Sequence, residues 1–216
     1  MFSGHFGVAF ASKRPAPAVS LATAILAAQW LDTLWPIFLL LGIEHVRIDP
    51  GNTRLTPLDF FDYPWTHSAL MAVVWGVVFG ATHFAFRRSA RAAFVLGALV
   101  PSHWVLDFLT HRPDLPLWPG GPRVGLGLWN APVAEAVLEA AIYVAGLAVY
   151  LRATRPRDRR GRLGAWAFAV FIPLLHVITA LSPPPPSVGA LAWSAAILPW
   201  PLLLWARWVD RHRQPR

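Results

Sequence analysis

The chain has 216 residues, of which 56% are hydrophobic and only 14% are charged, and it contains no cysteine. A soluble domain carries about 25% charged residues, so this composition argues against a soluble protein. Without cysteine there is no disulfide framework and no thiolate metal site, and any metal must be held by His, Asp and Glu. The net charge of +8 does not indicate nucleic-acid binding, because the arginines form short blocks between apolar segments.

Apolar segments follow one another along the whole chain. The first twelve residues are apolar but too short to cross a bilayer, and they predict a half-helix that enters the bundle from the cytoplasmic side. Six segments approach the roughly 20 residues that a membrane-spanning helix needs. They lie near 19–43, 67–86, 92–110, 132–151, 163–182 and 188–206.

These segments predict an all-α, polytopic membrane bundle of about six transmembrane helices with a short N-terminal apolar half-helix. We expect a single integral membrane domain over 1–216, with a metal-site core in 1–150 and two additional spans in 163–206. Its surroundings are therefore the lipid bilayer, and nucleic acid is not an expected partner.

The basic residues predict the orientation of the bundle. Of the 19 Lys and Arg residues, 15 lie before the first span, in the second-to-third and fourth-to-fifth loops, and after the sixth span. By the positive-inside rule these segments face the cytoplasm, so both termini are expected there, in a bacterial inner membrane. The outer loops, at about 44–66 and 111–131, are rich in Pro and Gly. They are expected to cover the outer end of the bundle.

Several ionisable residues lie at one depth inside the predicted spans, 12 to 15 residues from the basic end of each. They are Asp32, His103, Glu139 and His176. At about 1.5 Å per residue, this places them roughly 18–23 Å above the cytoplasmic boundary. Asp107 and Glu135 lie one turn further out, and His67 and His111 lie at the outer ends of their spans. Ionisable groups inside a membrane are costly and usually functional, so this convergence indicates a site.

The residue types and their spacing favour a metal. His103 and Asp107 are four residues apart, so both side chains share a helix face and can reach one ion. Glu135 and Glu139 repeat this spacing on the next span. Imidazole with carboxylate suits zinc, and also manganese or iron. We predict that a divalent metal, zinc first and manganese as the alternative, is bound by Asp32, His67, His103 and Asp107.

Each of these residues taken alone also has a simpler interpretation. A single intramembrane His or Asp often makes a helix–helix hydrogen bond, and this is the interpretation that we prefer for His176. Glu135 and Glu139 could share a proton or pair with Arg112 or Arg123. The remaining histidines lie near the membrane interfaces, where solvation is expected; they are His45, His83 and His212.

The order of the motifs resembles a known family. Its elements here are Gly4-His5, Asp32 in the first span, Thr66-His67-Ser68 opening the second, and His103-x-x-x-Asp107 in the third. Together they resemble the bacterial inner-membrane proteins known as membrane-bound metal-dependent hydrolases. The resemblance covers about residues 1–150, and the last two spans carry none of its motifs. It implies a metal and a hydrolytic reaction more firmly than it implies a substrate.

A fainter similarity is to zinc-dependent phospholipase C and the related zinc nucleases. Their ligands follow the order His, Asp, His, His-x-x-x-Asp, His and His-x-x-x-Glu. The chain matches the first five in order with His5, Asp32, His67, His103 and Asp107. By this similarity His111 stands for the sixth ligand, and Glu135 with Glu139 for the last pair. Those enzymes also bind metal through the amine of an N-terminal Trp, whereas this chain begins with Met1.

These observations favour a metal-dependent hydrolase that acts from the outer side on a small-molecule or lipid-type substrate, such as a phosphoester. Asp107 would bridge to a second ion at His5. Glu139 or Glu135 would act as the general base, because burial raises the pKa of a carboxylate toward neutrality. Substrate binding is assigned to His111, Arg112 and Arg123, since arginine suits an anion.

Two other functions remain open from the sequence. One is a transporter for divalent cations or protons, because intramembrane carboxylates and histidines also line ion pathways. Against it, the sequence has no inverted repeat and no paired broken helices. The other is a non-catalytic membrane scaffold in which the metal only locks the bundle.

Overall fold

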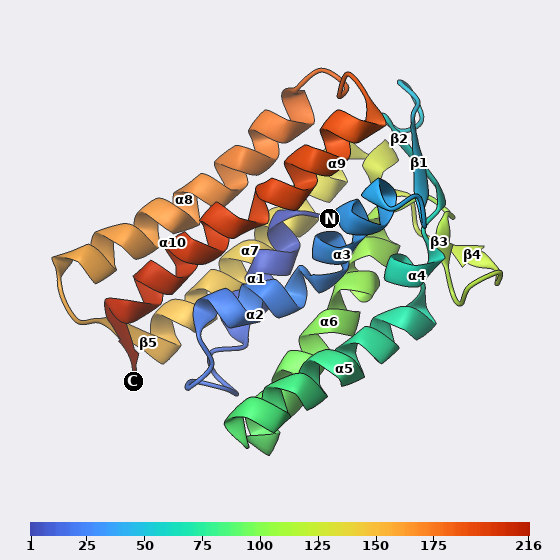
Figure 1. The fold of residues 1–216 in the computed structure, drawn as a ribbon. Helices are drawn as coiled ribbons and strands as arrows, with labels where there is room; N and C mark the ends of the chain where they lie inside the picture. The colour runs from blue at the N-terminus through green and yellow to red at the C-terminus, as the bar shows by residue number, and fades with distance from the viewer.

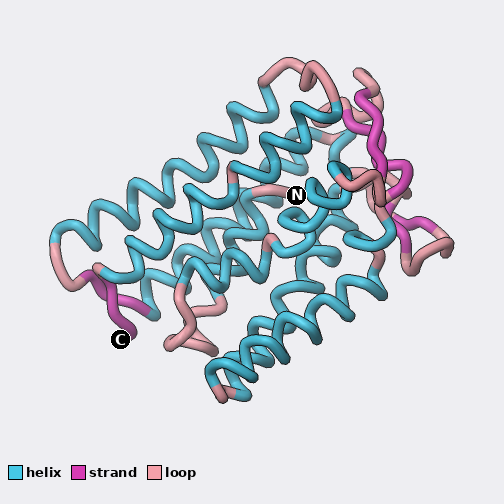
Figure 2. Tube along the Cα trace, viewed as in Figure 1, coloured by secondary structure: helices cyan, strands magenta, loops and turns pink.

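The computed structural model describes residues 1–216, and long helices that run side by side make up most of it (Figures 1 and 2). The first half contains α1 Ser3–Ala11, α2 Leu21–Ala28, α3 Trp30–Leu40, α4 Pro64–His67, α5 Ala69–Arg87 and α6 Ala90–Thr110. The second half contains a short 3-10 turn at Leu128–Asn130, then α7 Pro132–Ala153, α8 Arg159–Leu181, α9 Val188–Ile197 and α10 Pro199–Arg211.

Most of the long helices begin at a side chain that caps their first turn. Ser20, Ser68, Ser89 and Ser187 precede α2, α5, α6 and α9, and Asp158 precedes α8. Each side-chain oxygen accepts a hydrogen bond from a backbone N–H of the first turn, which would otherwise have no partner within the helix. These caps fix the starting points of the helices that carry or surround the site.

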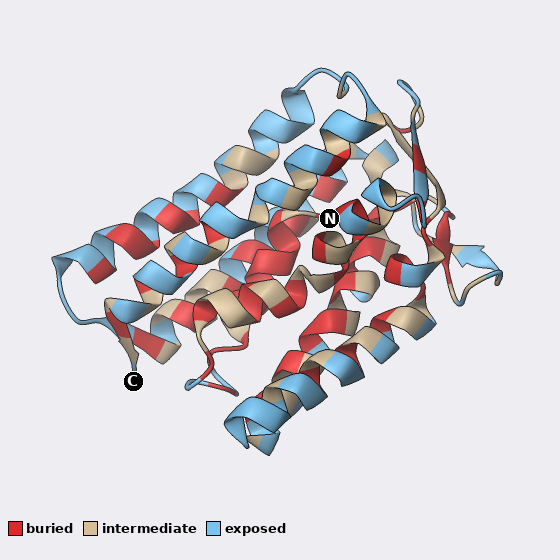
Figure 3. Ribbon diagram, viewed as in Figure 1, coloured by how far each residue is buried: buried red, intermediate tan, exposed pale blue.

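The membrane character of the bundle is confirmed. The helices α5, α6, α7, α8 and the joined α9–α10 are each long and apolar enough to cross a membrane, and the bent pair α2–α3 makes a sixth candidate. Large apolar side chains on these helices face outward, among them Phe86 and Phe94 at 83% and 78% exposed. Figure 3 shows the buried residues along the centre of the bundle and the exposed ones around it. A lipid environment explains this surface.

The first span is broken, whereas the sequence predicted one continuous segment over 19–43. The axes of α2 and α3 differ by 57°, and the break lies at Gln29. The break turns the carbonyl of Ala28 toward His103, whose Nδ1 donates to it at 2.8 Å. A backbone group released inside a membrane needs such a partner. The break also places Asp32 in the first turn of α3, at the end where the helix dipole favours a negative charge.

Helix α1 lies in the middle of the bundle, and it is nearly all buried. It crosses α7 where Gly7 meets Gly146, and a Cβ on either residue would overlap the backbone of the other helix. Such close crossings of small residues are common between membrane helices. The expected half-helix is therefore present, and Met1 lies inside the bundle, while the C-terminus lies at the end where the basic loops gather.

Three short two-stranded antiparallel sheets accompany the helical bundle that the sequence predicted. Strands β1 His45–Ile48 and β2 Leu58–Asp62 pair in the first outer loop, and β3 Leu115–Pro116 pairs with β4 Arg123–Val124 in the second. At the opposite end, β5 Thr154–Pro156 pairs with β6 Arg213–Pro215. Figure 2 shows the first two hairpins together beside the ends of α3 and α4. The outer loops are thus ordered by backbone pairing.

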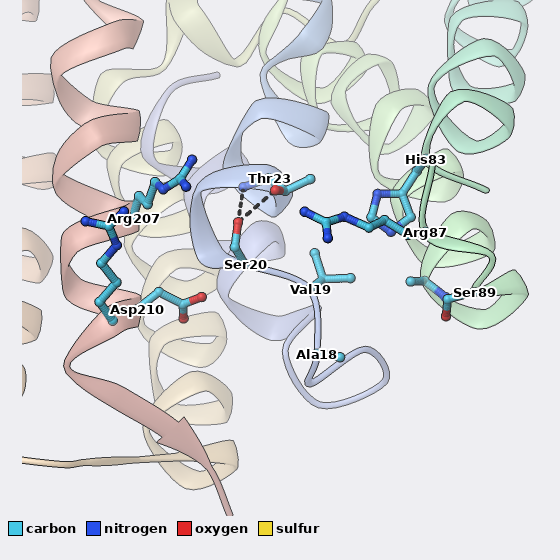
Figure 4. Close-up of a pocket in the computed structure, with 11 residues that line it drawn as sticks. Ala18, Val19, Ser20, Thr23, His83, Arg87, Ser89, Arg207 and Asp210 are labelled. Atoms are coloured by element: carbon cyan, nitrogen blue, oxygen red, sulfur yellow. Dashed lines mark hydrogen bonds between the residues drawn. The ribbon is translucent and has the colours of Figure 1, made fainter. Parts of the chain in front are cut away.

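The basic residues gather at the end opposite the two outer hairpins. A cavity of about 560 Å³ at this end is lined by Arg87, Arg207 and Arg211, with His83 and Asp210. Figure 4 shows Arg87 and Arg207 entering it from opposite walls, on α5 and α10. This asymmetry of charge is what the positive-inside rule requires of a cytoplasmic face. The orientation itself stays a prediction.

Because the chain has no cysteine, single cysteines test the orientation directly. We predict that Arg54→Cys, in the first outer loop, reacts with a membrane-impermeant thiol reagent from the periplasmic side of intact cells. Arg160→Cys should react only in inverted vesicles, since its loop is expected to be cytoplasmic. Both arginines are exposed, so access to the reagent is matched. Labelling of both from one side would contradict the six-span orientation.

Candidate metal centre

Five residues predicted as metal ligands lie together at the centre of the bundle. Four elements supply them: α1 provides His5, α3 provides Asp32, α4 provides His67, and α6 provides His103 and Asp107. Potential ligand atoms of His5, Asp32 and His103 lie within 4.8 Å of one another, and so do those of His67, His103 and Asp107. His103 belongs to both groups. We call these five residues the central cluster.

Asp107 joins the central cluster to the N-terminus of the chain. Its Oδ1 atom accepts a hydrogen bond from the Met1 amine at 2.7 Å and lies 3.1 Å from Nε2 of His5. Its Oδ2 atom lies 3.0 Å from Nε2 of His103. The spacing of four residues on α6 brings His103 and Asp107 to the same buried face, as the sequence predicted. The chain's own amine therefore reaches the centre, although its first residue is Met and not Trp.

Backbone contacts set the tautomer of His103. The carbonyl of Ala28 can only accept, so Nδ1 of His103 must carry the proton that forms this 2.8 Å hydrogen bond. In a neutral imidazole the other nitrogen is then a bare acceptor. That atom, Nε2, is fully buried and has no hydrogen-bond partner. It faces Asp107 at 3.0 Å and Asp32 at 3.5 Å.

A relay from Glu44 sets the tautomer of His67 in the same way. The Thr66 hydroxyl donates to a carboxylate oxygen of Glu44 at 2.7 Å, and it lies 2.8 Å from Nδ1 of His67. Because the hydroxyl proton is already used, the oxygen accepts from Nδ1–H and leaves Nε2 bare. That Nε2 lies 3.4 Å from Asp32. Second partners of this kind commonly orient histidines that bind metals.

The central cluster therefore has the donor set of a metal site. Two bare imidazole nitrogens and two carboxylates point at the same small space, where like lone pairs repel unless a cation lies between them. The ring of His5 stacks on that of His103, with centroids 3.8 Å apart and planes inclined by 2°. This stacking places a third imidazole beside the same space. The residues present can thus hold a divalent ion.

Glu135, Glu139 and His176 form a second cluster, separate from the first. Their potential ligand atoms also lie within 4.8 Å of one another. Glu139 accepts hydrogen bonds from the backbone N–H groups of Phe2 and Gly4, at 2.6 and 2.8 Å, and one from Ser3 Oγ at 2.6 Å. It therefore caps the N-terminus of α1. Glu139 and His176 lie at the same predicted depth as Asp32 and His103, but they form a separate group of potential ligand atoms with Glu135.

The outer-loop residues assigned to substrate binding have other partners. His111 is buried, with Nδ1 2.9 Å from Asp114, and burial lowers its pKa. Arg112 forms ion pairs with Asp59 and Asp114, so its charge is already balanced. Arg123 donates to the carbonyl of Phe61 at 2.6 Å. These contacts join the two outer hairpins to each other and to the end of α6. The assignment of these residues to substrate binding stays a prediction.

The sequence analysis did not single out two features of the centre. No sequence pattern marks Glu44, yet it is 1% exposed and its carboxylate caps α4 by accepting from the N–H groups of Trp65 and Thr66. Burial raises the pKa of Glu44. The contact of the Ala28 carbonyl could not be predicted from the sequence, because no Pro or Gly marks the helix break. Thr66, next to His67 in the Thr-His-Ser motif, was the one available signal for the relay.

Comparison with known proteins identifies the family. The family model described as YdjM inner membrane protein matches residues 63–183, more than half of the chain. The chain belongs to this family. It is therefore a multi-pass protein of the bacterial inner membrane. The matched segment includes His67, His103 and Asp107, whereas His5 and Asp32 precede it. No curated protein and no solved structure matches the chain.

The relay makes a prediction for the Thr-His-Ser segment of this chain. Thr66→Val keeps the side-chain shape but removes the hydroxyl that joins His67 to Glu44. We expect zinc affinity, measured by competition with a chelator, to fall about 10- to 100-fold. Ser68→Ala is the matched control, because Ser68 caps α5 and contacts Met71. It should lower thermal stability with little effect on zinc affinity. Unchanged zinc affinity in Thr66→Val would rule out the relay.

Proposed function

We propose that this protein is a membrane-embedded metal-dependent hydrolase whose central cluster holds one or two divalent ions. Zinc suits a mixed set of imidazole and carboxylate ligands, and manganese is the alternative. The observation that carries the proposal is that Nε2 has no proton in either His67 or His103. In each ring a hydrogen bond at Nδ1 fixes this tautomer. A purely structural histidine has no need of an unpartnered, buried nitrogen aimed at carboxylates.

We assign the predicted ligands to two ions. Asp32, His67, His103 and Asp107 would hold the first ion, and His5 with Asp107 would hold a second. A divalent ion bound in this way lowers the pKa of a water and polarises the bond under attack. The Met1 amine and the stacked His5 ring keep the Asp107 carboxylate in place. No cysteine competes for the ion in this chain.

Glu135 is the better candidate for the general base. Glu139 accepts three hydrogen bonds from the start of α1, so its oxygens are largely occupied. Glu135 is also buried, and it lines a cavity of about 430 Å³ together with Glu139, His176, Met1 and Trp129. This cavity lies on the side of the outer loops, since residues 55–58 of the first outer loop also line it. We therefore place the polar part of the substrate, such as a phosphoester, in this cavity.

One observation favours the rival function, a transporter of divalent cations. The broken span α2–α3 carries Asp32 directly after its break, and broken helices with exposed carbonyls are typical of ion-binding sites in transporters. However, only one helix pair is bent in this way, whereas transporters with inverted repeats pair two. The bent span equally serves a hydrolase, because it supplies both Asp32 and the Ala28 carbonyl to the centre.

Reconstitution distinguishes the two functions. The protein is placed in liposomes with zinc or manganese, phosphodiester and phospholipid substrates are supplied, and release of phosphate or headgroup is followed. We expect Glu135→Gln to keep its metal and to lose turnover by about 10²- to 10⁴-fold, the usual range for a general base. Asp49→Asn, an exposed carboxylate of the first outer loop, is the control and should keep full activity. Metal flux that depends on Asp32, with no ester hydrolysed across the panel, would decide for the transporter.

A further inference from the structure

A second cavity reaches the central cluster from the side of the bundle. It has a volume of about 290 Å³ and lies between α1, the α2–α3 break, α8 and the α9–α10 junction. Most of its lining is apolar, with Leu26, Leu202 and Leu203 among the residues. At its inner end the cavity is lined by Asp32, which belongs to the central cluster. We call it the lateral cavity.

Asp32 is the most exposed residue of the central cluster. Its side chain is 43% exposed, whereas those of the four other members are between 0% and 5% exposed. The exposed part of Asp32 faces the lateral cavity, since Asp32 is one of its lining residues. A molecule that reaches the central cluster along this route must therefore pass along an apolar wall.

The mouth of the lateral cavity opens where these helices meet lipid. Leu198, at the α9–α10 junction, lines the cavity and is 42% exposed, and Thr179 of α8 lines it and is also exposed. Residues 195–203, which form one wall, lie in the middle of the candidate span Val188–Arg211. At that depth the surrounding medium is hydrocarbon and not water. The cavity thus offers mainly apolar surface to lipid chains, and Asp32 is the one charged residue in its lining.

We propose that the substrate is a bilayer lipid that enters from the side, with a hydrocarbon chain in the lateral cavity and its polar head at Asp32. This inference rests on the proposed function and names its substrate class. The cavity lies near the lower end of the usual range for ligand pockets, about 300–1,000 Å³, so it accommodates part of one chain and not a whole lipid. The rest of the lipid stays in the bilayer.

The neighbouring cavity provides carboxylates and a histidine beside the apolar one, as the polar part of an amphipathic molecule requires. Phe2 and Thr179 line both the lateral cavity and the cavity of about 430 Å³ that Glu135 lines. The two cavities therefore meet at these residues. The lateral cavity is mostly apolar, whereas Glu135, Glu139 and His176 line the other. A lipid at this junction would have its chain on the apolar side and its head between Asp32 and the general base. A fully water-soluble ester has no use for the apolar half.

Photolabelling tests the lateral cavity without relying on turnover. The full-length protein is reconstituted in vesicles of phospholipid that include a phospholipid with a diazirine in its acyl chain. After irradiation, we expect labelled peptides to include Leu26 and Leu203. Ala195→Trp places an indole in the cavity, since Ala195 lines it, and should reduce this labelling at least about tenfold. Ile197→Trp, on the same helix but 59% exposed and outside the cavity lining, should leave labelling unchanged.

A second variant guards against misfolding of the first. Leu26→Gln fills no space but makes the cavity polar, and it should also reduce labelling while zinc content stays at the wild-type level. Equal labelling of Leu26 and Leu203 in wild type and Ala195→Trp would overturn the lateral cavity. Hydrolysis of phospholipid that persists in Ala195→Trp would overturn it as well. Labelling at these residues without hydrolysis of any ester would support the lipid site and contradict the proposed hydrolase.

Discussion

The structure depends on placing two aspartates among imidazoles inside a membrane. A carboxylate at the centre of a bilayer costs about 2.5–3.5 kcal/mol on insertion scales, and Asp107 is 2% exposed. That cost is offset only if counter-charges and hydrogen bonds surround the oxygens. Asp107 has the Met1 amine as a counter-charge. The Nε2 atoms of His67 and His103 face Asp32 and Asp107 without a proton in the neutral tautomers described above, so they do not offset the charge. A divalent cation between them would complete the balance of charge.

The same requirement explains the unusual position of α1. A short apolar helix that does not span has unpaired N–H groups at its start, deep in low dielectric. Glu139 satisfies those of Phe2 and Gly4, and the close crossing of Gly7 with Gly146 holds the helix against α7. Docked in this way, α1 delivers His5 to the central cluster. The second cluster thus supports the first, because the residues that cap α1 determine where His5 lies.

The sequence predicted the spans and half of the site for identifiable reasons. Long apolar runs and arginine blocks mark the helices, and counting the rise per residue placed Asp32 and His103 at a common level, with Asp107 one turn further out. Depth alone does not specify which way a side chain faces, so it did not show that Glu139 and His176 form a cluster of their own with Glu135. The five central residues came together in the structure as the order of the motifs implied, while their role as metal ligands stays a prediction.

Other features were not predictable because they depend on contacts between distant segments. The break at Gln29 has no Pro or Gly at it, and its freed Ala28 carbonyl is paired only by His103, which lies 75 residues away. Glu44 reaches Thr66 across 22 residues, and no local pattern links them. Arg112 forms an ion pair with Asp59 of β2, which lies 53 residues before it in the chain. In each case the contact joins segments that are far apart in the sequence.

The most direct test of the central claim is the metal content of purified protein. Zinc and manganese are measured in the wild type, in His103→Ala and Asp107→Ala, and in His176→Ala as the control from the second cluster. If the central cluster binds metal as one unit, the first two variants lose the metal and lose stability with it, because removing one ligand leaves buried charges unpaired. His176→Ala should keep most of the wild-type load. A full wild-type load in His103→Ala and Asp107→Ala would contradict the account.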